Sequence, residues 1–155
     1  MPPGLREELK QTKPFARRSA EAAVSVMRTA AVLEHELNDV LKPHGLTLTQ
    51  YNVLRILRGA GASGLCGREV GERLISRVPD VSRLLERMED TGVVSRERDD
   101  NDRRHVTARI TEAGRLLLES VTPELEVVER ARFGRLGESV LQAMIMALAH
   151  VRETT

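Results

Sequence analysis

The chain has 155 residues, a single cysteine and nearly balanced charge, with 24 basic and 23 acidic side chains. This length allows one core, or a small core shared with a partner chain, and makes two independent domains improbable. One cysteine excludes an intramolecular disulfide framework, the amino-terminal segment lacks the pattern of a secretory signal, and no apolar run approaches the roughly 20 residues that span a bilayer. We expect a cytoplasmic protein with no membrane partner.

The composition favours a helical protein. Aromatic residues make up only 2% of the chain, so aliphatic and methionine side chains must form the core. Such a core favours helices packed on helices over an all-β barrel. Of the 24 basic residues 21 are arginine, whose planar fork of donors matches phosphate and guanine. This excess mildly favours a nucleic-acid partner, although a GC-rich coding sequence would produce the same bias.

The first third of the chain predicts an arm followed by two helices. Residues 1–14 combine prolines with charges, so we expect a poorly ordered arm. From Phe15 apolar residues recur at three- and four-residue steps, which predicts a long amphipathic helix that Pro43 and Gly45 end. A second helix begins with Thr47 or Thr49 as its cap and ends in a glycine-rich turn.

The middle third predicts a helix-turn-helix and a hairpin. A brief helix over 67–74 and a second one over 76–90 are separated by the few residues that a helix-turn-helix needs, and Gly92 supplies a left-handed cap. Strand-like runs over 93–98 and 106–110 flank a turn rich in Asp and Asn, which indicates a hairpin. A hairpin directly after a helix-turn-helix forms a wing. We expect residues 47–110 to form a winged helix-turn-helix lobe.

The last third predicts two further helices. Thr111 caps the first, in which Pro123 either introduces a kink or, with Thr122 as cap, begins a new helix. Gly134 and Gly137 interrupt the pattern before a final amphipathic helix. The expected fold is mainly α with a small β-hairpin wing.

The helical ends of the chain, residues 15–45 and 111–155, are apolar enough to require a partner. They lie on opposite sides of the winged lobe in sequence, so we expect them to interdigitate as the dimerisation region of a homodimer. A two-fold dimer would present two winged units about 34–36 Å apart, the spacing of successive major grooves. Residues 15–155 would then form one domain, and a monomeric bundle is the alternative.

The start of the second helix of the helix-turn-helix has the composition of a major-groove reader. Polar and apolar side chains alternate so that one face can pack on the core while the other reaches base edges and phosphates of double-stranded DNA. Proline suits the first turn of such a helix. A solvated surface helix is the alternative. The candidate contacts are Arg77, Pro79, Asp80, Ser82 and Arg83.

The wing tip carries adjacent arginines, Arg103 and Arg104. One guanidinium can enter the narrow minor groove, where the negative potential is strongest, while the other contacts phosphate. We expect Asp102 to pair with Arg104 and fix its rotamer. Residues 68–109 contain ten arginines and ten acidic residues, so binding depends on how the charges are distributed over the surface. Further candidate phosphate contacts are Arg68, Arg96 and Arg98.

Residues 74–94, the wing over 96–104 and the segment Ile110-Thr-Glu-Ala-Gly114 together resemble the MarR family of multiple-antibiotic-resistance-type regulators. The resemblance implies a triangular homodimer that binds a palindromic operator, usually as a repressor. It also implies release on binding a small phenolic or anionic ligand, or on cysteine oxidation. By match to the family's motif, Arg104 would be the minor-groove arginine with Asp102 as its partner, and the helix beginning near Arg77 would be the major-groove reader.

The sequence offers several candidates for the signal that would release the regulator from DNA. A ligand pocket between the helical ends and the winged lobe is expected, with Arg17 or Arg18 as an anion partner. Cys66, in the turn before the helix-turn-helix, is either a small buried residue or a redox sensor. The histidines are scattered singly, so no metal site is expected.

An enzyme would need a nucleophile and base, a carboxylate pair or a phosphate loop, and none occurs at a recognisable spacing. We therefore expect neither catalysis nor a cofactor. The main alternative to DNA binding is a winged domain that binds only proteins.

Overall fold

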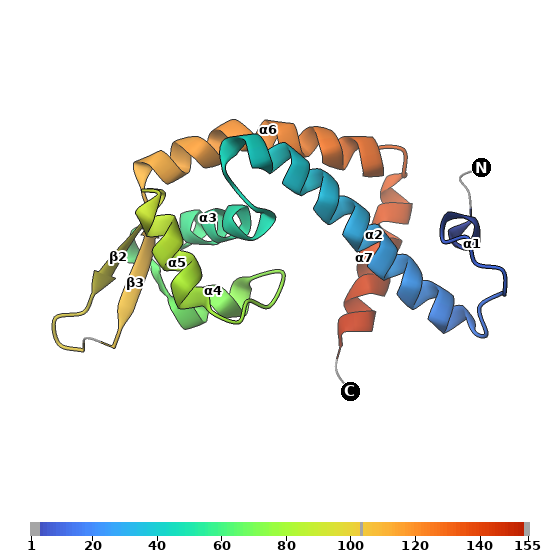
Figure 1. The fold of residues 1–155 in the computed structure, drawn as a ribbon, viewed down its shortest axis with the longest axis horizontal. Coiled ribbons are helices and arrows are strands. Elements are labelled where there is room, and N and C mark those ends of the chain that lie inside the picture. Colours follow the sequence, from blue (N-terminus) through green and yellow to red (C-terminus); the bar gives the residue numbers. More distant parts are fainter. Residues whose placement is uncertain (1–3, 103, 154–155) are drawn as a thin grey trace.

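The computed structural model describes residues 4–102 and 104–153, and Figure 1 shows that they form an arch. The helix α6 (Glu112–Phe133) forms the top, and α2 (Arg18–Leu41) descends from it toward α7 (Glu138–Arg152). The winged lobe lies below the amino-terminal end of α6, and α7 follows its carboxy-terminal end. The short α1 (Leu5–Glu8) lies on the side away from the lobe. None of the helices in these described residues is long and apolar enough to cross a membrane.

The first long helix ends where the sequence predicts. It begins at Arg18, slightly later than predicted, and ends at Leu41, where a 3₁₀ turn (Lys42–His44) follows. Gly45 then takes a left-handed conformation with φ of 72°, which a residue with a Cβ rarely adopts. The predicted stop is therefore confirmed.

The next helix, α3 (Leu48–Ala60), uses Thr47 as its cap. The Thr47 hydroxyl accepts a hydrogen bond from the Gln50 N–H at 3.2 Å, and Gln50 Oε1 accepts one from the Thr47 N–H at 2.9 Å. This reciprocal capping box settles which of the two predicted threonines caps the helix. A 3₁₀ turn (Gly61–Ser63) follows α3.

A three-stranded antiparallel sheet extends the predicted hairpin. The strands β2 (Val94–Arg98) and β3 (Val106–Ile110) pair as expected, and β1 (Leu65–Cys66) adds to the other edge of β3. The sequence did not predict β1, because a strand of two residues leaves no periodicity to detect. Cys66 therefore lies in a strand and not in a turn.

The helix-turn-helix consists of α4 (Gly67–Arg73) and α5 (Val81–Asp90). The prediction that the second helix begins at Ser76 is wrong, because the chain stays non-helical until Asp80. Pro79 disfavours helical geometry in the residue before it, and the Asp80 side chain caps the helix. The turn between the two helices is correspondingly longer than predicted.

The carboxy-terminal helices resolve the alternative at Pro123. The helix α6 continues through Pro123, so of the two alternatives the new helix capped by Thr122 is wrong. The Thr122 hydroxyl instead donates to the carbonyl of Leu118 at 2.7 Å. Thr111 caps α6 as predicted, because its hydroxyl accepts from the Gly114 N–H at 3.1 Å. The last helix, α7, buries none of its residues.

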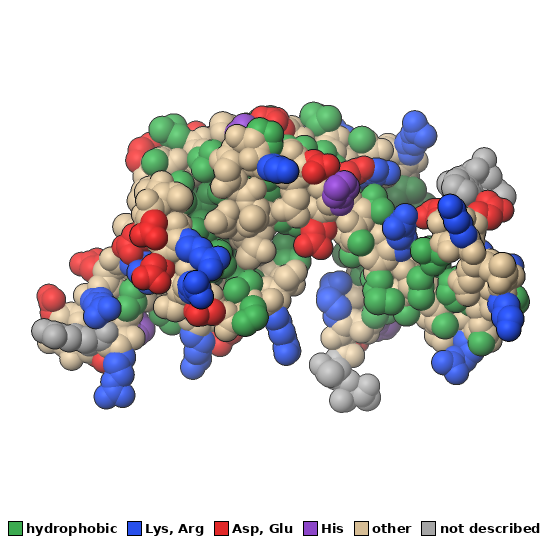
Figure 2. Space-filling model, in the orientation of Figure 1, with side chains coloured by type: hydrophobic (Ala, Val, Ile, Leu, Met, Phe, Trp, Pro, Cys, Tyr) green, Lys and Arg blue, Asp and Glu red, His purple; other side chains and the backbone are tan. Residues whose placement is uncertain are grey.

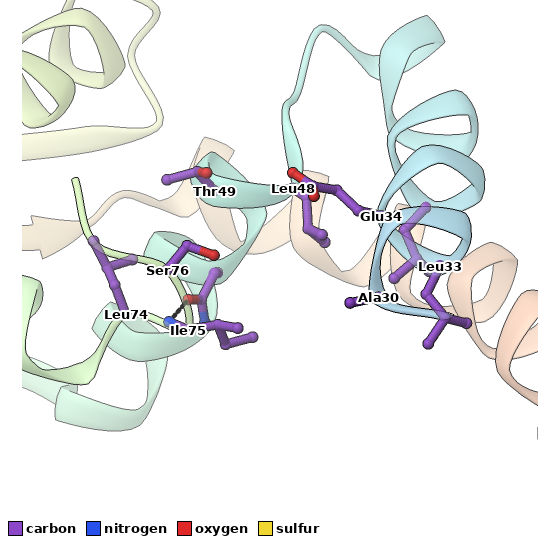
Figure 3. Close-up of a pocket in the computed structure, with 10 residues that line it drawn as sticks. Ala30, Leu33, Glu34, Leu48, Thr49, Leu74, Ile75 and Ser76 are labelled. Carbon is purple, nitrogen blue, oxygen red and sulfur yellow. Dashed lines mark hydrogen bonds between the residues drawn. The ribbon is translucent and has the colours of Figure 1, made fainter. Parts of the chain in front are cut away.

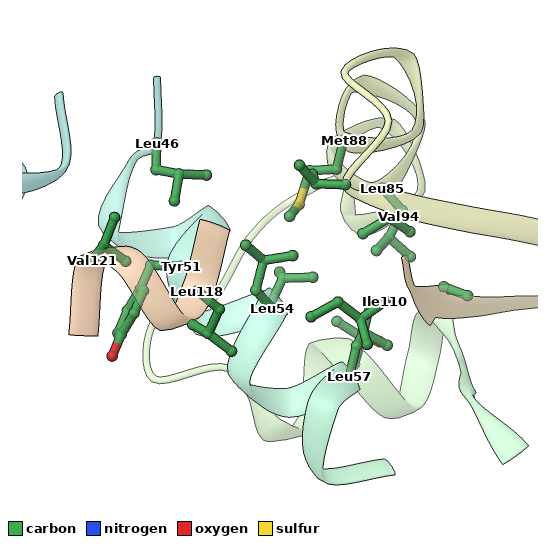
Figure 4. Packing of buried hydrophobic residues seen from close by; sticks show 14 of the residues in the cluster. Leu46, Tyr51, Leu54, Leu57, Leu85, Met88, Val94, Ile110, Leu118 and Val121 are labelled. Atoms are coloured by element: carbon green, nitrogen blue, oxygen red, sulfur yellow. The ribbon is translucent and has the colours of Figure 1, made fainter. Parts of the chain in front are cut away.

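The hydrophobic core is concentrated in the winged lobe (Figure 4). The helix α3 contributes much of it, and side chains from α5 and the strands pack around them. The helix α6 anchors the lobe through its amino-terminal half. The fully buried large side chains are Leu41, Val53, Leu54, Leu57, Val70, Met88, Val94, Leu118 and Val121.

Candidate nucleic-acid interface

The helix α5 has one buried and one exposed face. Leu85 and Met88 are buried in the core, whereas Ser82, Arg83 and Arg87 are exposed. Because residues four apart on a helix lie above one another, the two arginines form one basic edge of α5. Sequence reasoning did not single out Arg87, and its spacing from Arg83 is the signal that would have found it.

The segment before α5 holds the remaining residues predicted for this helix. Asp80 Oδ1 accepts a hydrogen bond from the Arg83 N–H at 2.9 Å, so this carboxylate caps the helix and does not project from it. Arg77 and Pro79 are exposed in the preceding turn. Of the five residues predicted on the helix, only Ser82 and Arg83 lie on it.

Acidic side chains organise the turn of the wing. The Asp99 carboxylate accepts hydrogen bonds from the backbone N–H groups of Asn101 at 2.7 Å and Asp102 at 3.3 Å. These donors stabilise the charged form and hold the pKa of Asp99 below its ordinary range. The Asp99 N–H also donates to the carbonyl of His105 at 2.9 Å, which closes the turn. The wing therefore uses this acid to fix its own backbone.

The Asp102 carboxylate contacts Arg104 differently from the prediction. Its Oδ1 accepts from the backbone N–H of Arg104 at 3.1 Å, and within the described residues the two side chains form no ion pair. Arg103 lies outside the described residues. The exposed Arg104 shares a hollow between α4, α5 and the wing with polar side chains. These are Arg68, Glu69, Ser82 and His105.

Other arginines of the lobe are engaged by carboxylates. Arg96 Nε lies 2.8 Å from Glu89 Oε2, and Glu89 Oε1 accepts from the Arg96 N–H at 3.0 Å. The guanidinium holds the pKa of Glu89 below its ordinary value. Arg109 lies 2.9 Å from a carboxylate oxygen of Glu97. We therefore leave Arg96 out of the candidate interface, because its charge is already neutralised within the lobe.

These ion pairs leave the unpaired arginines on one side of the winged lobe, although residues 68–109 contain equal numbers of arginines and acidic residues. In the described part of the chain, ion pairs occupy Arg96 and Arg109 of the sheet but neither arginine of α5. Figure 2 shows basic side chains projecting from the lower edge of the winged lobe, where the beginning of α5 and the wing also lie in Figure 1. We call the following exposed arginines without an ion pair to a described residue the basic face: Arg77, Arg83, Arg87 and Arg104.

The two remaining phosphate candidates are less favourably placed. Arg68 Nε lies 3.1 Å from Glu72 Oε1, but the Arg68 side chain is 85% exposed, and such exposed pairs are weak enough for it to contact another anion. Arg98 lines a polar hollow of the wing together with Asp99 and Asp100. The structure thus brings Arg68 near Arg104 and places Arg98 among acids.

A separate cavity of about 260 Å³ lies between α2, α3 and the segment before α5. We call it the α2–α3 cavity. Neither Arg17 nor Arg18 lines it, because Arg18 lies about 18 Å along α2 from Ala30, at 1.5 Å per residue. The structure therefore does not support these arginines as ligand contacts within one chain. The cavity is lined by Ala30, Leu33, Glu34, Leu37, Leu48, Thr49, Asn52, Leu74, Ile75 and Ser76.

The half-buried Cys66 caps α4. Its N–H donates to Glu69 Oε2 at 2.8 Å, and its side chain accepts from the backbone of the same turn. The hydrogen bond from the Cys66 N–H holds the pKa of Glu69 below its ordinary value. A role in starting α4 accounts for Cys66 without redox chemistry.

Comparison with known proteins gives a consistent picture. A model of the MarR family matches residues 44–105. The chain is 31% identical over 114 residues to YkoM, an uncharacterised HTH-type transcriptional regulator of Bacillus subtilis, covering 70% of this chain and 72% of that protein. It is also 31% identical over 109 residues to the HTH-type transcriptional repressor Rv2887 of Mycobacterium tuberculosis, covering 70% of this chain and 74% of the repressor.

Among solved structures, the chain is similar to CouR of Rhodococcus jostii in complex with p-coumaroyl-CoA. The TM-score is 0.75 and the identity 25%, with 91% of this chain and 98% of CouR covered.

Proposed function

Because the chain belongs to the MarR family of DNA-binding transcription regulators, we propose that it binds a palindromic operator as a homodimer and represses transcription until a small molecule releases it. Residues 47–110 form the DNA-binding lobe in this proposal, and residues 15–45 and 111–155 form the dimerisation region. The relatives are transcription regulators and not enzymes, and we propose no catalytic role.

The basic face is the observation that supports DNA contact by this lobe. The exposed side of α5 offers Arg83 and Arg87 to the major groove, where a guanidinium can bind guanine or phosphate with two hydrogen bonds. Arg104 in the wing is placed for the adjacent minor groove, whose negative potential attracts arginine. A module that binds only proteins would not need these arginines to remain without carboxylate partners.

The exposed apolar side chains of α2 and α7 support the homodimer. A helix without a single buried residue cannot be held by this chain's own core, and α7 is such a helix. A second copy related by a two-fold axis would cover α7 and place two basic faces on one side of a duplex. The apolar side chains left exposed on these two helices include Val26, Met27, Val140, Ile145, Met146 and Val151.

The α2–α3 cavity is the proposed effector site. It lies between a helix of the dimerisation region and the winged lobe, so an occupant touches both (Figure 3). Its walls are largely apolar with a few polar groups, which is the usual character of small-molecule sites.

One hydrogen bond connects this cavity to the approach of α5. Asn52 lines the cavity, and its Oδ1 accepts from the backbone N–H of Ile75 at 2.9 Å (Figure 3). Ile75 begins the turn that leads to the Asp80 cap. An occupant that moves Asn52 would therefore shift the start of α5 and weaken DNA contact by favouring a second position of the basic face.

Selection from a pool of random duplexes tests the proposal. We expect enrichment of a palindrome whose half-sites are about 10 base pairs apart, and affinity that falls steeply between roughly 50 and 200 mM salt. A scrambled duplex of the same composition is the control. Failure to enrich any sequence, or equal binding to the scrambled duplex, would contradict sequence-specific binding.

A further inference from the structure

We infer that the α2–α3 cavity selects an apolar molecule carrying a positive charge, such as an aryl-alkyl amine, over an anionic one. This inference rests on the proposed effector role of the cavity and adds the charge class of its occupant. It differs from the anionic ligand that the sequence resemblance implies.

The walls of the cavity call for an apolar body. Most of the lining is hydrocarbon, so burying a ligand's apolar surface there is favourable. Helix α2 supplies one wall, and α3 with the segment before α5 supplies the other (Figure 3). The apolar lining residues are Ala30, Leu33, Leu37, Leu48, Leu74 and Ile75.

The charged side chain in the lining of the cavity is acidic. Glu34 contributes the carboxylate, and its side chain extends from α2 toward Leu48 at the beginning of α3 (Figure 3). Among the described residues, no Lys, Arg or His lines the cavity, and the Glu34 carboxylate has no ion-pair partner. Even Arg77, which follows the lining residue Ser76 directly, is not part of the wall. A bound anion would therefore meet repulsion without a compensating cation.

The neutral polar side chains of the lining also suit a ligand that donates hydrogen bonds. The hydroxyl oxygens of Thr49 and Ser76 can accept hydrogen bonds from an ammonium group. Asn52 Oδ1 is already engaged by the Ile75 N–H, so Asn52 keeps its amide donors. A carboxylate ligand would have only neutral donors while lying beside Glu34, whereas an ammonium would gain the charge-assisted contact.

Three probes with the same phenyl-alkyl body separate charge from shape: phenethylammonium, hydrocinnamyl alcohol and hydrocinnamate. Binding to the full chain is measured by NMR titration near neutral pH and at low salt. We expect the cation to bind about fivefold more tightly than the neutral alcohol, as an accessible carboxylate allows, and the anion to bind most weakly. Equal affinities, or tightest binding of the anion, would overturn the inference.

Two variants test whether Glu34 causes the preference for the cationic probe. Glu34→Gln should remove the preference for phenethylammonium while the neutral alcohol binds as before. Asp39→Asn, which removes the same charge from α2 outside the cavity, should leave the preference intact. Equal effects of both variants would show that overall charge, and not the cavity, selects the probe.

The inference and the proposed function fail in different ways. If the anion binds most tightly and still releases the selected operator, only the charge class is wrong. If none of the three probes changes the chemical shifts of the lining residues, the cavity is not a ligand site. Both the charge class and the effector role are then overturned. Operator binding without any probe tests the DNA proposal independently.

Discussion

The winged lobe and α7 use their apolar residues in opposite ways. In the lobe, α3 buries Tyr51, Val53, Leu54 and Leu57, and it packs mainly against β3 and α6. In α7, apolar residues recur at helical spacing but none is buried by the chain itself. The lobe is therefore stabilised by its own sequence, whereas the proposed second copy would cover α7. Substitutions in the two regions should separate stability from assembly.

The largest effect is expected in the lobe. Leu54 is fully buried, so Leu54→Ala should lower the free energy of unfolding by about 2–5 kcal/mol through lost burial and a cavity. Urea denaturation measures the change. Leu116→Ala, at a side chain that is 59% exposed, is the control and should cost less than about 0.5 kcal/mol. Similar costs at both positions would contradict the placement of the core.

A charge on α7 should break assembly while leaving the lobe folded. Ile145 is 55% exposed in one chain, and Ile145→Asp would bury a carboxylate in the proposed dimer interface. We expect the homodimer to weaken by about 2–4 kcal/mol, measured by sedimentation equilibrium, with helix content retained. Ser95→Asp, at an exposed position of β2 outside the proposed dimerisation region, should leave the dimer intact. A dimer unaffected by Ile145→Asp would place the interface elsewhere.

Within the lobe, the basic face should govern DNA affinity and not stability. Arg83→Ala and Arg104→Ala should each weaken operator binding by about 1–3 kcal/mol, measured by fluorescence anisotropy at fixed salt. Arg109→Ala is the control, since this guanidinium is engaged by Glu97 and by the carbonyl of Ala62. If Arg109→Ala weakens binding as much as Arg104→Ala, the sheet and not the basic face contacts DNA.

The hydrogen bond between Asn52 and Ile75 joins the two regions. Asn52→Ala should lower stability by about 1 kcal/mol and, more informatively, reduce the ability of a bound effector to weaken operator affinity. Operator titrations with and without a cavity-binding probe measure this coupling.

A matched control exists on α2. Asn38 Oδ1 accepts from the Leu48 N–H at 2.9 Å, which is the same kind of bond at the same length, but Asn38, unlike Asn52, does not line the cavity. Asn38→Ala should cost similar stability and preserve the response to the probe. Loss of the response in both variants would show that general loosening, and not this link, transmits occupancy.

Features set by local patterns could be predicted from the sequence. The hairpin and the end of α2 follow from alternation and from punctuation by glycine and proline. The family itself could be recognised from residues 74–114. The start of α5 was misplaced because apolar spacing continues through Val78, while Pro79 and Asp80 locally favour a cap.

Features set by contacts between elements could not be predicted. Glu89 neutralises Arg96 across the junction of α5 and β2, which no spacing rule indicates. The α2–α3 cavity likewise collects residues from three separated segments, and only the structure shows that Glu34 and not Arg17 lies there. Whether a charge is engaged or exposed depends on such non-local neighbours.

The Glu89–Arg96 pair offers the smallest and most specific test of this distinction between engaged and exposed charges. Arg96 holds the pKa of Glu89 below its ordinary value of 4.5, so the folded state favours the charged carboxylate. The resulting stability is present above the unfolded-state pKa and is lost as the pH falls through the lower folded-state pKa. The side chain of Glu89 is 37% exposed, so the contribution at neutral pH is at most about 1 kcal/mol.

Glu89→Gln should therefore be less stable than the parent at neutral pH, and the two unfolding free energies should converge in acid below the ordinary pKa of a glutamate. Urea denaturation at a series of pH values measures this convergence. Glu126→Gln, at an exposed position on α6 without an ion pair in the described residues, should differ from the parent by the same small amount at every pH. A constant difference for Glu89→Gln as well would mean that Arg96 is not held by Glu89 in solution and is free to contact DNA.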